Sequence, residues 1–388
     1  MAYSILFNLE GKRPSMPERE IRLLEESFKK YYFDRFDLIH IPEKPPMREF
    51  GYQKFSSGMI RHLTIKDDKE LRLMIMRNVP SDIYCSNGYY SFPNLPMAEK
   101  DWQGADLIFD IDAKDLNLPC RPNHIVHKCV DCNKTFHKDS LCPNCGSSKH
   151  NSKSFPCSIC IDGAKKEVEK LSQILIEDLG VDEKSIHVYF SGNEGFHVYV
   201  HDTNFQKLGS RERNELVDYM MFRGAIPETF GMKKSKPNRS SFCSFEEKGW
   251  RGRVSKEIFG SKSRRSKIIT QIMNDGYQSF ARQLEQISTK IGANIDPNVT
   301  TDIHRIFRLP GSLNSKSGLA KVFCEDLKQF NPYTDSCFID DTKTQVIANL
   351  PFEFKLKNEK FGPYNEESVS MPRFAALYMI CKGLASVV

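Results

Sequence analysis

Hydrophobic residues recur at helical spacing in several segments of this chain. Ser15-Met16-Pro17-Glu18 resembles a capping box with an early proline, and the apolar positions that follow predict a helix to about Tyr32. A second amphipathic helix is predicted over about 163–179, with Gly180 as its stop. A last one is predicted over 374–385. Residues 205–291 are also helical in pattern, apart from a basic loop at 232–267.

Other segments alternate between apolar and polar residues, which is typical of strands. The stretch 105–113 reads A-D-L-I-F-D-I-D-A, and within 186–200 the strands I-H-V-Y-F-S and F-H-V-Y-V flank a G-N-E-G turn. Residues 48–63 predict a hairpin that turns near Ser57-Gly58, and 71–77 predict a further strand. From Asn294 the chain returns to strand and turn character. This mixture predicts an α/β (α+β) fold.

Composition narrows the class of protein. The chain has 388 residues, no apolar run long enough to span a bilayer and no secretory signal, so we expect a cytoplasmic protein. Its net charge is only +6, but 232–267 holds twelve Lys or Arg against three acids. With Phe242, Phe245 and Trp250 interleaved, this stretch suits a polyanion that it would track by charge and stacking. A solvated, charged loop explains the same composition.

Two aspartates are the most informative feature. Asp110 and Asp112 lie one residue apart in the 105–113 strand, so their side chains point to the same face. Leu107, Phe109 and Ile111 point the other way, toward a core. Carboxylates about 7 Å apart along a strand are costly unless a cation lies between them, and Mg²⁺ prefers such oxygen ligands. A pair of solvated strand-edge aspartates is the alternative.

The cysteines predict zinc rather than disulfides, because the protein is expected to be cytosolic. Two C-x-x-C pairs separated by nine residues have the spacing of a closed, structural tetrahedral site, formed by Cys129, Cys132, Cys142 and Cys145. A flanking set leaves a second zinc site open, with free buried thiols as the alternative and His127 able to replace the histidine; it comprises Cys120, His124, Cys157 and Cys160. Core or surface thiols are expected at Cys85, Cys243, Cys324, Cys337 and Cys381.

Two glycine-containing segments carry possible phosphate donors. Ser191 and His197 lie at the ends of a short loop in which Gly192 and Gly195 let backbone N–H groups approach an anion. A glycine turn between two strands that binds nothing is the alternative. Further on, the 294–318 segment offers a third carboxylate and several donors, namely Asp296, Arg308, Ser312, Asn314 and Lys316. No Walker-type phosphate loop is present, which argues against an ATPase of that class.

Taken together and in this order, these blocks resemble the catalytic (small) subunit of the archaeo-eukaryotic DNA primase, in its archaeal form. The resemblance runs from about Arg48 to the C-terminus. It covers the paired acids of D-L-I-F-D-I-D-A, the S-G-x-x-G-x-H motif at 191–197, the I-D-x-x-V-T acid Asp296, and R-L-P-G-S-L-x-x-K-S-G at 308–318. A zinc module directly after the paired acids is also expected of the family.

The resemblance implies primer synthesis on single-stranded DNA template from nucleoside triphosphates, for DNA replication. It implies that Asp110, Asp112 and Asp296 hold two Mg²⁺ or Mn²⁺ ions. The expected nucleotide-binding residues are Ser191, Gly192, His197, Arg308, Asn314 and Lys316, with Arg48 and Arg61 near the initiating nucleotide or phosphates. A large subunit with an iron–sulfur cluster is the expected partner in a heterodimer.

The resemblance also implies an organisation in three parts. The catalytic core of mixed sheets flanked by helices is expected over 1–116, 162–204 and 292–388. A zinc-binding module is inserted at 117–161, and 205–291 form a smaller, mainly helical subdomain. Two alternatives remain open: a repair primase-polymerase of the same superfamily, and a non-catalytic zinc-ribbon protein that binds nucleic acid.

Two departures from the family pattern concern the nucleotide. Relatives often carry arginine between the glycines of the S-G-x-x-G-x-H loop, where this chain has Asn193 and Glu194. A glutamate beside a triphosphate would repel it, so we expect the Glu194 side chain to turn away. Asn314 stands where relatives commonly have histidine. Neither change removes a metal ligand, but both bear on nucleotide affinity.

Overall fold

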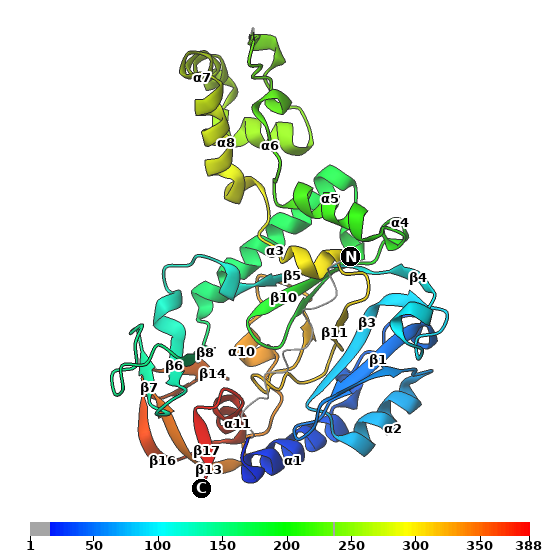
Figure 1. Ribbon diagram of the computed structural model, residues 1–388, viewed down its shortest axis with the longest axis vertical. Coiled ribbons are helices and arrows are strands. Elements are labelled where there is room, and N and C mark those ends of the chain that lie inside the picture. The colour runs from blue at the N-terminus through cyan, green and yellow to red at the C-terminus, as the bar shows by residue number, and fades with distance from the viewer. Residues whose placement is uncertain (1–15, 236) are drawn as a thin grey trace.

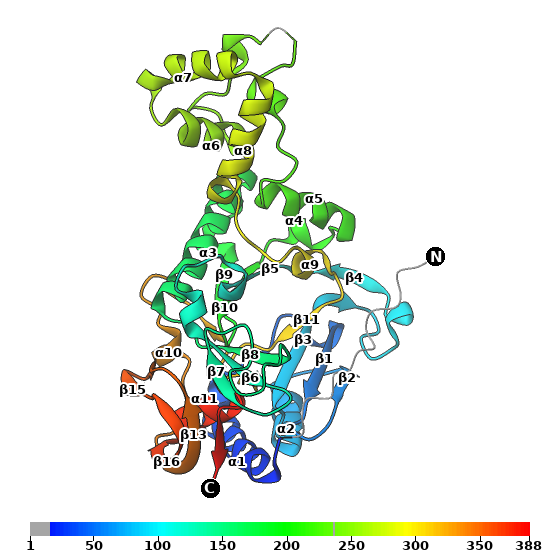
Figure 2. The same ribbon diagram turned by 60° about the vertical axis from the view of Figure 1, so that its left-hand side comes forward.

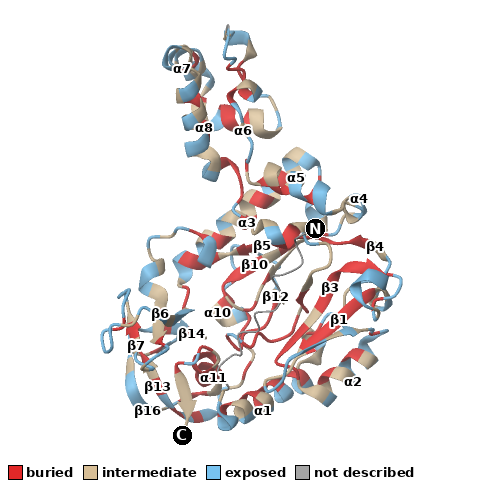
Figure 3. Cartoon of the chain, in the orientation of Figure 1, coloured by how far each residue is buried: buried red, intermediate tan, exposed pale blue. Residues whose placement is uncertain are grey.

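The computed structural model describes residues 16–235 and 237–388 of the chain. Two β-sheets form the sides of a central pocket, and helices cover their outer faces (Figure 1). A helical arm rises from one end of this core and a small C-terminal sheet lies at the other, as Figure 2 also shows. Buried residues concentrate in the strands of the two sheets and on the inner sides of the helices (Figure 3). No helix in these described ranges is long and apolar enough to cross a membrane.

One sheet is built largely from the N-terminal third of the chain, with strand order β11-β3-β1-β2 and β4 paired to β3. The predicted hairpin is present, because β1 pairs with β2 in antiparallel register. Helices α1 and α2 bury their apolar sides in the same core as this sheet. The bounds are β1 (Arg48–Gln53), β2 (Met59–Leu63), β3 (Asp82–Tyr90), β4 (Trp102–Ala105), β11 (Ile306–Arg308), α1 (Glu18–Asp34) and α2 (Asp68–Asn78).

Two sequence-based expectations about these helices differ from the structure or lie partly outside it. The strand predicted over 71–77 is wrong, because this segment lies inside α2. The carboxylate of Asp67 accepts a hydrogen bond from the Glu70 N–H and caps the helix, and Leu71 and Ile75, four residues apart, are its buried positions. Ser15 of the proposed capping box lies outside the described residues, and α1 begins after Pro17 without a side-chain cap.

The second sheet carries the paired acids and has the order β12-β9-β10-β5. Strands β9 and β10 are the predicted pair around the G-N-E-G turn, and β10 lies between β9 and β5. Helix α3 packs on the outer face of β5 and β10. It begins at Ser158, five residues earlier than the sequence predicts. The bounds are β5 (Leu107–Asp112), β9 (Ile186–Phe190), β10 (Gly195–Val200), β12 (Val322–Phe323) and α3 (Ser158–Leu179).

The arm, defined as residues 222–291, has a hydrophobic core of its own. It follows α5 (Ser210–Met220) and contains α6 (Gly249–Phe259), α7 (Lys262–Asp275) and α8 (Tyr277–Ile291). The chain leaves and re-enters the core at one point, because the Ala293 N–H donates a 2.8 Å hydrogen bond to the Met220 carbonyl. The basic stretch 232–267 is not one loop, since it includes all of α6 and the start of α7.

The remaining strands form three small sheets, one of which is the two-stranded β14–β15 pair. The cysteine-rich segment folds into β7-β6-β8, and the C-terminal sheet has the order β16-β13-β17. Phe155, directly after β8, packs against Phe352 and Tyr378 of the C-terminal region. The bounds are β6 (Ile125–Cys129), β7 (Thr135–His137), β8 (His150–Ser154), β13 (Lys343–Leu350), β14 (Phe354–Leu356), β15 (Glu359–Phe361), β16 (Tyr364–Pro372), β17 (Ala385–Val387), α4 (Thr203–Gln206), α9 (Pro297–Thr301), α10 (Pro332–Asp335) and α11 (Arg373–Cys381).

Candidate active site and metal centres

Three acids from distant parts of the chain converge at the end of β5. Asp110 and Asp112 alternate with buried residues along this strand, as the hydrophobic pattern predicts. Asp296 is the N-cap residue of α9, and its backbone N–H donates a 2.9 Å hydrogen bond to the Asp110 carbonyl. The backbone at Asp296 is therefore tied to the backbone at Asp110. The Asp112 carboxylate forms an ion pair with Lys114 in this arrangement.

The electrostatics of this cluster favour a bound cation. Burial raises the pKa of Asp110 to about 7, and the negative charges of Asp112 and Asp296 add to the effect. The Oδ1 atom of Asp110 is buried and accepts no hydrogen bond within the described chain. A buried, unsatisfied carboxylate oxygen beside two further acids fits a hard divalent cation such as Mg²⁺ or Mn²⁺.

A glycine makes room for these acids. Gly195 lies opposite Asp112 in the β10–β5 pair, and a Cβ at this position would lie 2.0 Å from Asp112 Oδ1. Any side chain there would collide with the carboxylate. The second glycine of the S-G-x-x-G-x-H motif is therefore needed for the close approach of the two strands, apart from any contact with phosphate.

His197 lies opposite Asp110 in the same strand pair, with its Nε2 3.4 Å from Asp110 Oδ1. Its other ring nitrogen, Nδ1, is 3.0 Å from Nζ of Lys321. Burial, with the positive charge of Lys321, holds the pKa of His197 well below its usual value, so the ring is neutral at pH 7. When Lys321 donates to Nδ1, the remaining ring proton sits on Nε2 and faces the acid cluster.

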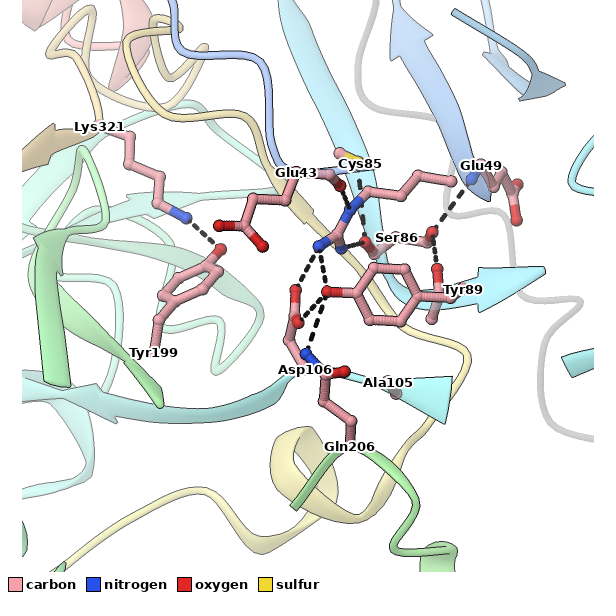
Figure 4. A network of polar contacts seen from close by, with 12 residues as sticks. Glu43, Glu49, Cys85, Ser86, Tyr89, Ala105, Asp106, Tyr199, Gln206 and Lys321 are labelled. Atoms are coloured by element: carbon pink, nitrogen blue, oxygen red, sulfur yellow. Dashed lines mark hydrogen bonds and ion pairs between the residues drawn. The ribbon is translucent and has the colours of Figure 1, made fainter. Parts of the chain in front are cut away.

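Lys321 is a site residue that the sequence reasoning missed. It is fully buried, and its Nζ also contacts the Tyr199 hydroxyl at 2.8 Å and the Arg308 carbonyl at 2.9 Å. Figure 4 shows its side chain directed at the Tyr199 hydroxyl. These three contacts match the three N–H bonds of an ammonium. Lys321 lies only three residues beyond Gly318, but its spacing gave no signal because a single lysine after a turn is common.

The two glycine-containing segments predicted to bind phosphate lie side by side. Gly192 adopts φ +85°, and a Cβ there would come within 3.1 Å of Asn314 Cβ. The Asn314 side-chain amide donates to the Ser191 carbonyl at 3.4 Å. Ser191, Gly192 and Asn314 are thus brought together. The Lys316 side chain is exposed beside them, whereas buried Ser312 bonds to the Leu309 carbonyl.

The three predicted arginines already have acidic partners. Arg308 is buried and pairs with Asp82 at 2.7 Å. Arg48 pairs with Asp106 at 2.6 Å and donates to the Tyr89 hydroxyl; Figure 4 shows the meeting of Asp106 and Tyr89. Arg61 pairs with Glu49 at 2.8 Å. Arg48 and Arg308 lie on the wall of a pocket of about 400 Å³ between the two sheets, whereas Arg61 does not line it.

Glu194, the acid that would repel a triphosphate at this loop, is buried and has a cationic neighbour. Its carboxylate lies 3.5 Å from the Arg121 guanidinium. The adjacent Asn193 side chain accepts a 3.4 Å hydrogen bond from Lys382. The two loop positions that differ from the family pattern therefore face basic residues from other parts of the chain.

Both cysteine sets have the geometry of metal sites. The ligand atoms of Cys129, Cys132, Cys142 and Cys145 all lie within 4.8 Å of one another, and the same holds for Cys120, His124, Cys157 and Cys160. Four thiolates, or three with one imidazole, fit tetrahedral zinc. His127 is not part of the second set, because it packs against His150 and bonds to Ser152. Cys85, Cys243, Cys324 and Cys337 are buried, as expected of core thiols, and Cys381 is half-buried.

Comparisons with known proteins extend these observations. A family model described as DNA primase small subunit matches residues 148–326. The DNA primase small subunit PriS of Nitrosopumilus maritimus (strain SCM1) is 62% identical over 372 residues, which is 96% of this chain and 100% of that protein. PriS of Cenarchaeum symbiosum (strain A) is 57% identical over 371 residues, again 96% of this chain and 100% of that protein.

A more distant relative and one solved structure are also similar to this chain. PriS of Pyrobaculum aerophilum is 32% identical over 367 residues, covering 92% of this chain and 96% of that protein. The polymerase domain of Mycobacterium tuberculosis ligase D in complex with DNA aligns at a TM-score of 0.38 and 10% identity, over 79% of this chain and 83% of that one. A likeness of this size adds nothing to the sequence relationships.

Proposed function

The chain belongs to the DNA primase small-subunit family, in its archaeal form, and we propose that Asp110, Asp112 and Asp296 are the acids of its nucleotidyl-transfer site. The protein is the catalytic subunit of a primase, a nucleotidyltransferase that acts in DNA replication. We propose further that it synthesises short primers on single-stranded DNA template from nucleoside triphosphates. The contact between Asp296 and Asp110 is the observation that carries the assignment of the acids.

The three acids would hold two Mg²⁺ or Mn²⁺ ions. Such ions, when bound, lower the pKa of an attacking hydroxyl and stabilise the leaving pyrophosphate. Asp110 supports this role with its buried Oδ1, which accepts no hydrogen bond within the described residues. Asp112 supports it from the same face of β5, and its present partner Lys114 would be displaced by a cation. Asp296 completes the set from the start of α9.

The triphosphate would lie along the loop of Ser191 and Gly192, within reach of His197. A neutral His197 with its proton on Nε2 donates a hydrogen bond and takes no proton, so we assign it to phosphate binding rather than to base catalysis. Asn314 and Lys316 belong to the adjoining loop and would add donors. Arg308 would contribute charge from the pocket wall, and we propose Arg48 for the initiating nucleotide from the same wall.

Zinc is proposed at both cysteine sets, as a structural ion in each. Four protein ligands leave no open position, so neither ion would take part in the reaction. The set around Cys157 and Cys160 would fix the start of α3, because Cys157 is its N-cap residue and Cys160 lies in its first turn. The other set would hold the β6–β8 ribbon. A large primase subunit is the proposed partner in a heterodimer.

The test is a primer-synthesis assay on the purified chain with single-stranded template, labelled nucleotides and Mg²⁺ or Mn²⁺. The matched control is the Asp110→Asn, Asp112→Asn double variant, which preserves shape and removes charge. We expect template-dependent products from the natural chain and none from the variant. Equal activity in both would refute the site. Metal analysis of the same sample should return two zinc ions per chain.

A further inference from the structure

The arm differs from the rest of the molecule in charge. Residues 222–291 contain 15 Lys or Arg and six Asp or Glu, a net charge of +9, whereas the whole chain carries +6. The remainder of the protein is therefore slightly acidic. Positive charge concentrated in one projecting element attracts a polyanion.

Part of this positive charge serves the structure of the arm. Arg253 pairs with Asp178 of α3 at 3.0 Å and braces the arm against the core. Arg265 donates to the carbonyls of Phe242 and Cys243. Arg251 pairs with Glu247 and also donates to backbone carbonyls. These arginines are committed to holding the arm together.

Four other cations of the arm make no structural ion pair. Lys248, Lys256, Arg264 and Lys267 are exposed and have no ion-pair partner among the described residues. Lys248 and Lys256 lie at the start of α6 and in its last turn, and Arg264 and Lys267 lie in the first half of α7. On α7 they are away from its buried positions, Ile269 and Ile272. Unpaired surface cations are the groups that exchange counterions for phosphates.

The aromatic residues of the same stretch cannot form a stacking surface. Phe242 is buried in the arm's core, and Phe245 packs on Phe259. Trp250 stacks on Tyr219, with ring centroids 5.1 Å apart, and donates to the Tyr219 carbonyl. The arm therefore offers charge without exposed rings, which suits contact with a sugar–phosphate backbone rather than with bases.

The base of the arm adjoins the proposed reaction centre. Helix α8 ends at Ile291, five residues before Asp296. Figures 1 and 2 show the arm rising beyond α3 and α5, on the side of the core where α9 lies. A DNA strand bound at the acid cluster and running toward this side of the core would reach the arm.

We propose that the free cations of α6 and α7 form a surface that holds the backbone of the single-stranded template beside the acid cluster. This identification of the polyanion rests on the proposed function. Contacts of this kind are independent of base sequence and depend strongly on salt. Binding by the arm should therefore raise the affinity of the protein for the template without selecting the position where synthesis starts.

The test compares two full-length variants of equal net charge. The arm variant carries Lys248→Gln, Lys256→Gln, Arg264→Gln and Lys267→Gln. The control variant carries Lys29→Gln, Lys69→Gln, Lys343→Gln and Lys355→Gln, which are exposed lysines of the core. Affinity for a labelled oligothymidylate is measured by anisotropy over about 50–200 mM salt. Thermal unfolding of each variant checks that the fold is kept.

We expect the arm variant to bind about tenfold or more weakly at low salt, with the slope of log affinity against log salt reduced by about 0.7 for each phosphate that the arm no longer neutralises. The control variant should match the natural chain. Equally weakened binding in both variants would overturn the proposal. Unchanged binding in the arm variant would also overturn it, and would indicate that the arm's cations face a protein partner instead of DNA.

The acid-cluster variant separates this inference from the proposed activity. Asp110→Asn with Asp112→Asn should bind the oligonucleotide as the natural chain does. If the natural chain makes no primers but the arm variant still binds more weakly, the activity proposal fails and the arm surface stands. If primers are made and the arm variant binds normally, the arm proposal fails alone.

Discussion

In the core, cations such as Arg48, Arg308 and Lys100 are buried against Asp106, Asp82 and Glu49 at 2.6–2.7 Å. In the arm, the Lys262–Glu246 and Lys290–Glu257 pairs lie at the surface, and several cations have no ion pair among the described residues. Buried pairs fix the position of strands around the pocket, because separating them would leave an unpaired charge inside the protein. Exposed cations hold little structure and stay available to a ligand. Cations of the core thus hold its strands in place, whereas several cations of the arm remain free at the surface.

The largest effect should come from the acid cluster. Asp110→Asn with Asp112→Asn should reduce primer synthesis by about a thousandfold or more, because the divalent ions lose their oxygen ligands. Single-turnover extension of a preformed primer measures this loss. Circular dichroism and oligonucleotide binding should remain those of the natural chain. Activity within about tenfold of normal would place the reaction elsewhere.

The second prediction sets a buried pair against an exposed one. Asp82→Asn leaves the buried Arg308 guanidinium without its counter-charge and should lower the free energy of unfolding by about 3–5 kcal/mol. Glu246→Gln breaks the exposed Lys262–Glu246 pair of the arm and should not shift the denaturation midpoint measurably. Urea denaturation of both variants measures the contrast. Equal shifts would contradict the division of roles between core and arm.

The third prediction concerns Lys321, which we assign a positioning role through His197. Lys321→Met removes the donor to His197 Nδ1 and should lower kcat/KM for nucleotide by about 10–100-fold, mainly through KM. Nitrogen NMR of His197 should show the Nε2–H tautomer in the natural chain and a mixture in Lys321→Met. Lys321→Arg, which keeps a donor, is the matched control and should retain more activity. An unchanged tautomer in Lys321→Met would refute this role.

The smallest effect concerns Lys382, a buried lysine of the core. Burial lowers its pKa from 10.5 to about 8, so the folded state disfavours the ammonium relative to the unfolded chain. Above pH 10.5 the Lys382 amine is neutral in both the folded and the unfolded chain, so its burial carries no charge penalty. As the pH falls from 10.5 toward 8, the unfolded chain takes up the proton first and the folded state loses stability relative to it. Lys382→Met should therefore raise the free energy of unfolding at pH 7 by on the order of 1–2 kcal/mol. The gain should vanish above pH 10.5 in chemical denaturation. A loss of stability at pH 7 would contradict it.

Local patterns were sufficient for the paired acids and for the C-x-x-C pairs of both cysteine sets. Asp110 and Asp112 follow strand alternation, and the C-x-x-C spacing brings two thiolates of a pair together. The hairpin at 48–63 was equally local. The meeting of Cys120 with Cys157 and Cys160, 37 and 40 residues away, depends on the fold. Helix α2 was mistaken for a strand because its apolar run L-R-L-M-I-M outweighed the weaker capping signal of Asp67.

Contacts between residues far apart in the chain could not be predicted from local sequence patterns. The neighbourhood of Asp296 and Asp110 followed from family resemblance, because no local rule joins positions separated by a whole arm. The partners of Arg48 and Arg308 were missed for the same reason, since Asp106 and Asp82 come from distant segments. Arg61 pairs with Glu49 within the predicted hairpin. Lys321 was missed because its importance arises only when β10 brings His197 and Tyr199 beside it.

The hydrogen bond from the Ala293 N–H to the Met220 carbonyl shows that the arm is an insertion whose two ends lie side by side. The arm could be lengthened, shortened or replaced by a short connector, and Asp296 would keep its place beside Asp110. On the proposed role of the arm, a change confined to residues 222–291 alters how firmly the template is held and leaves the acid cluster in place.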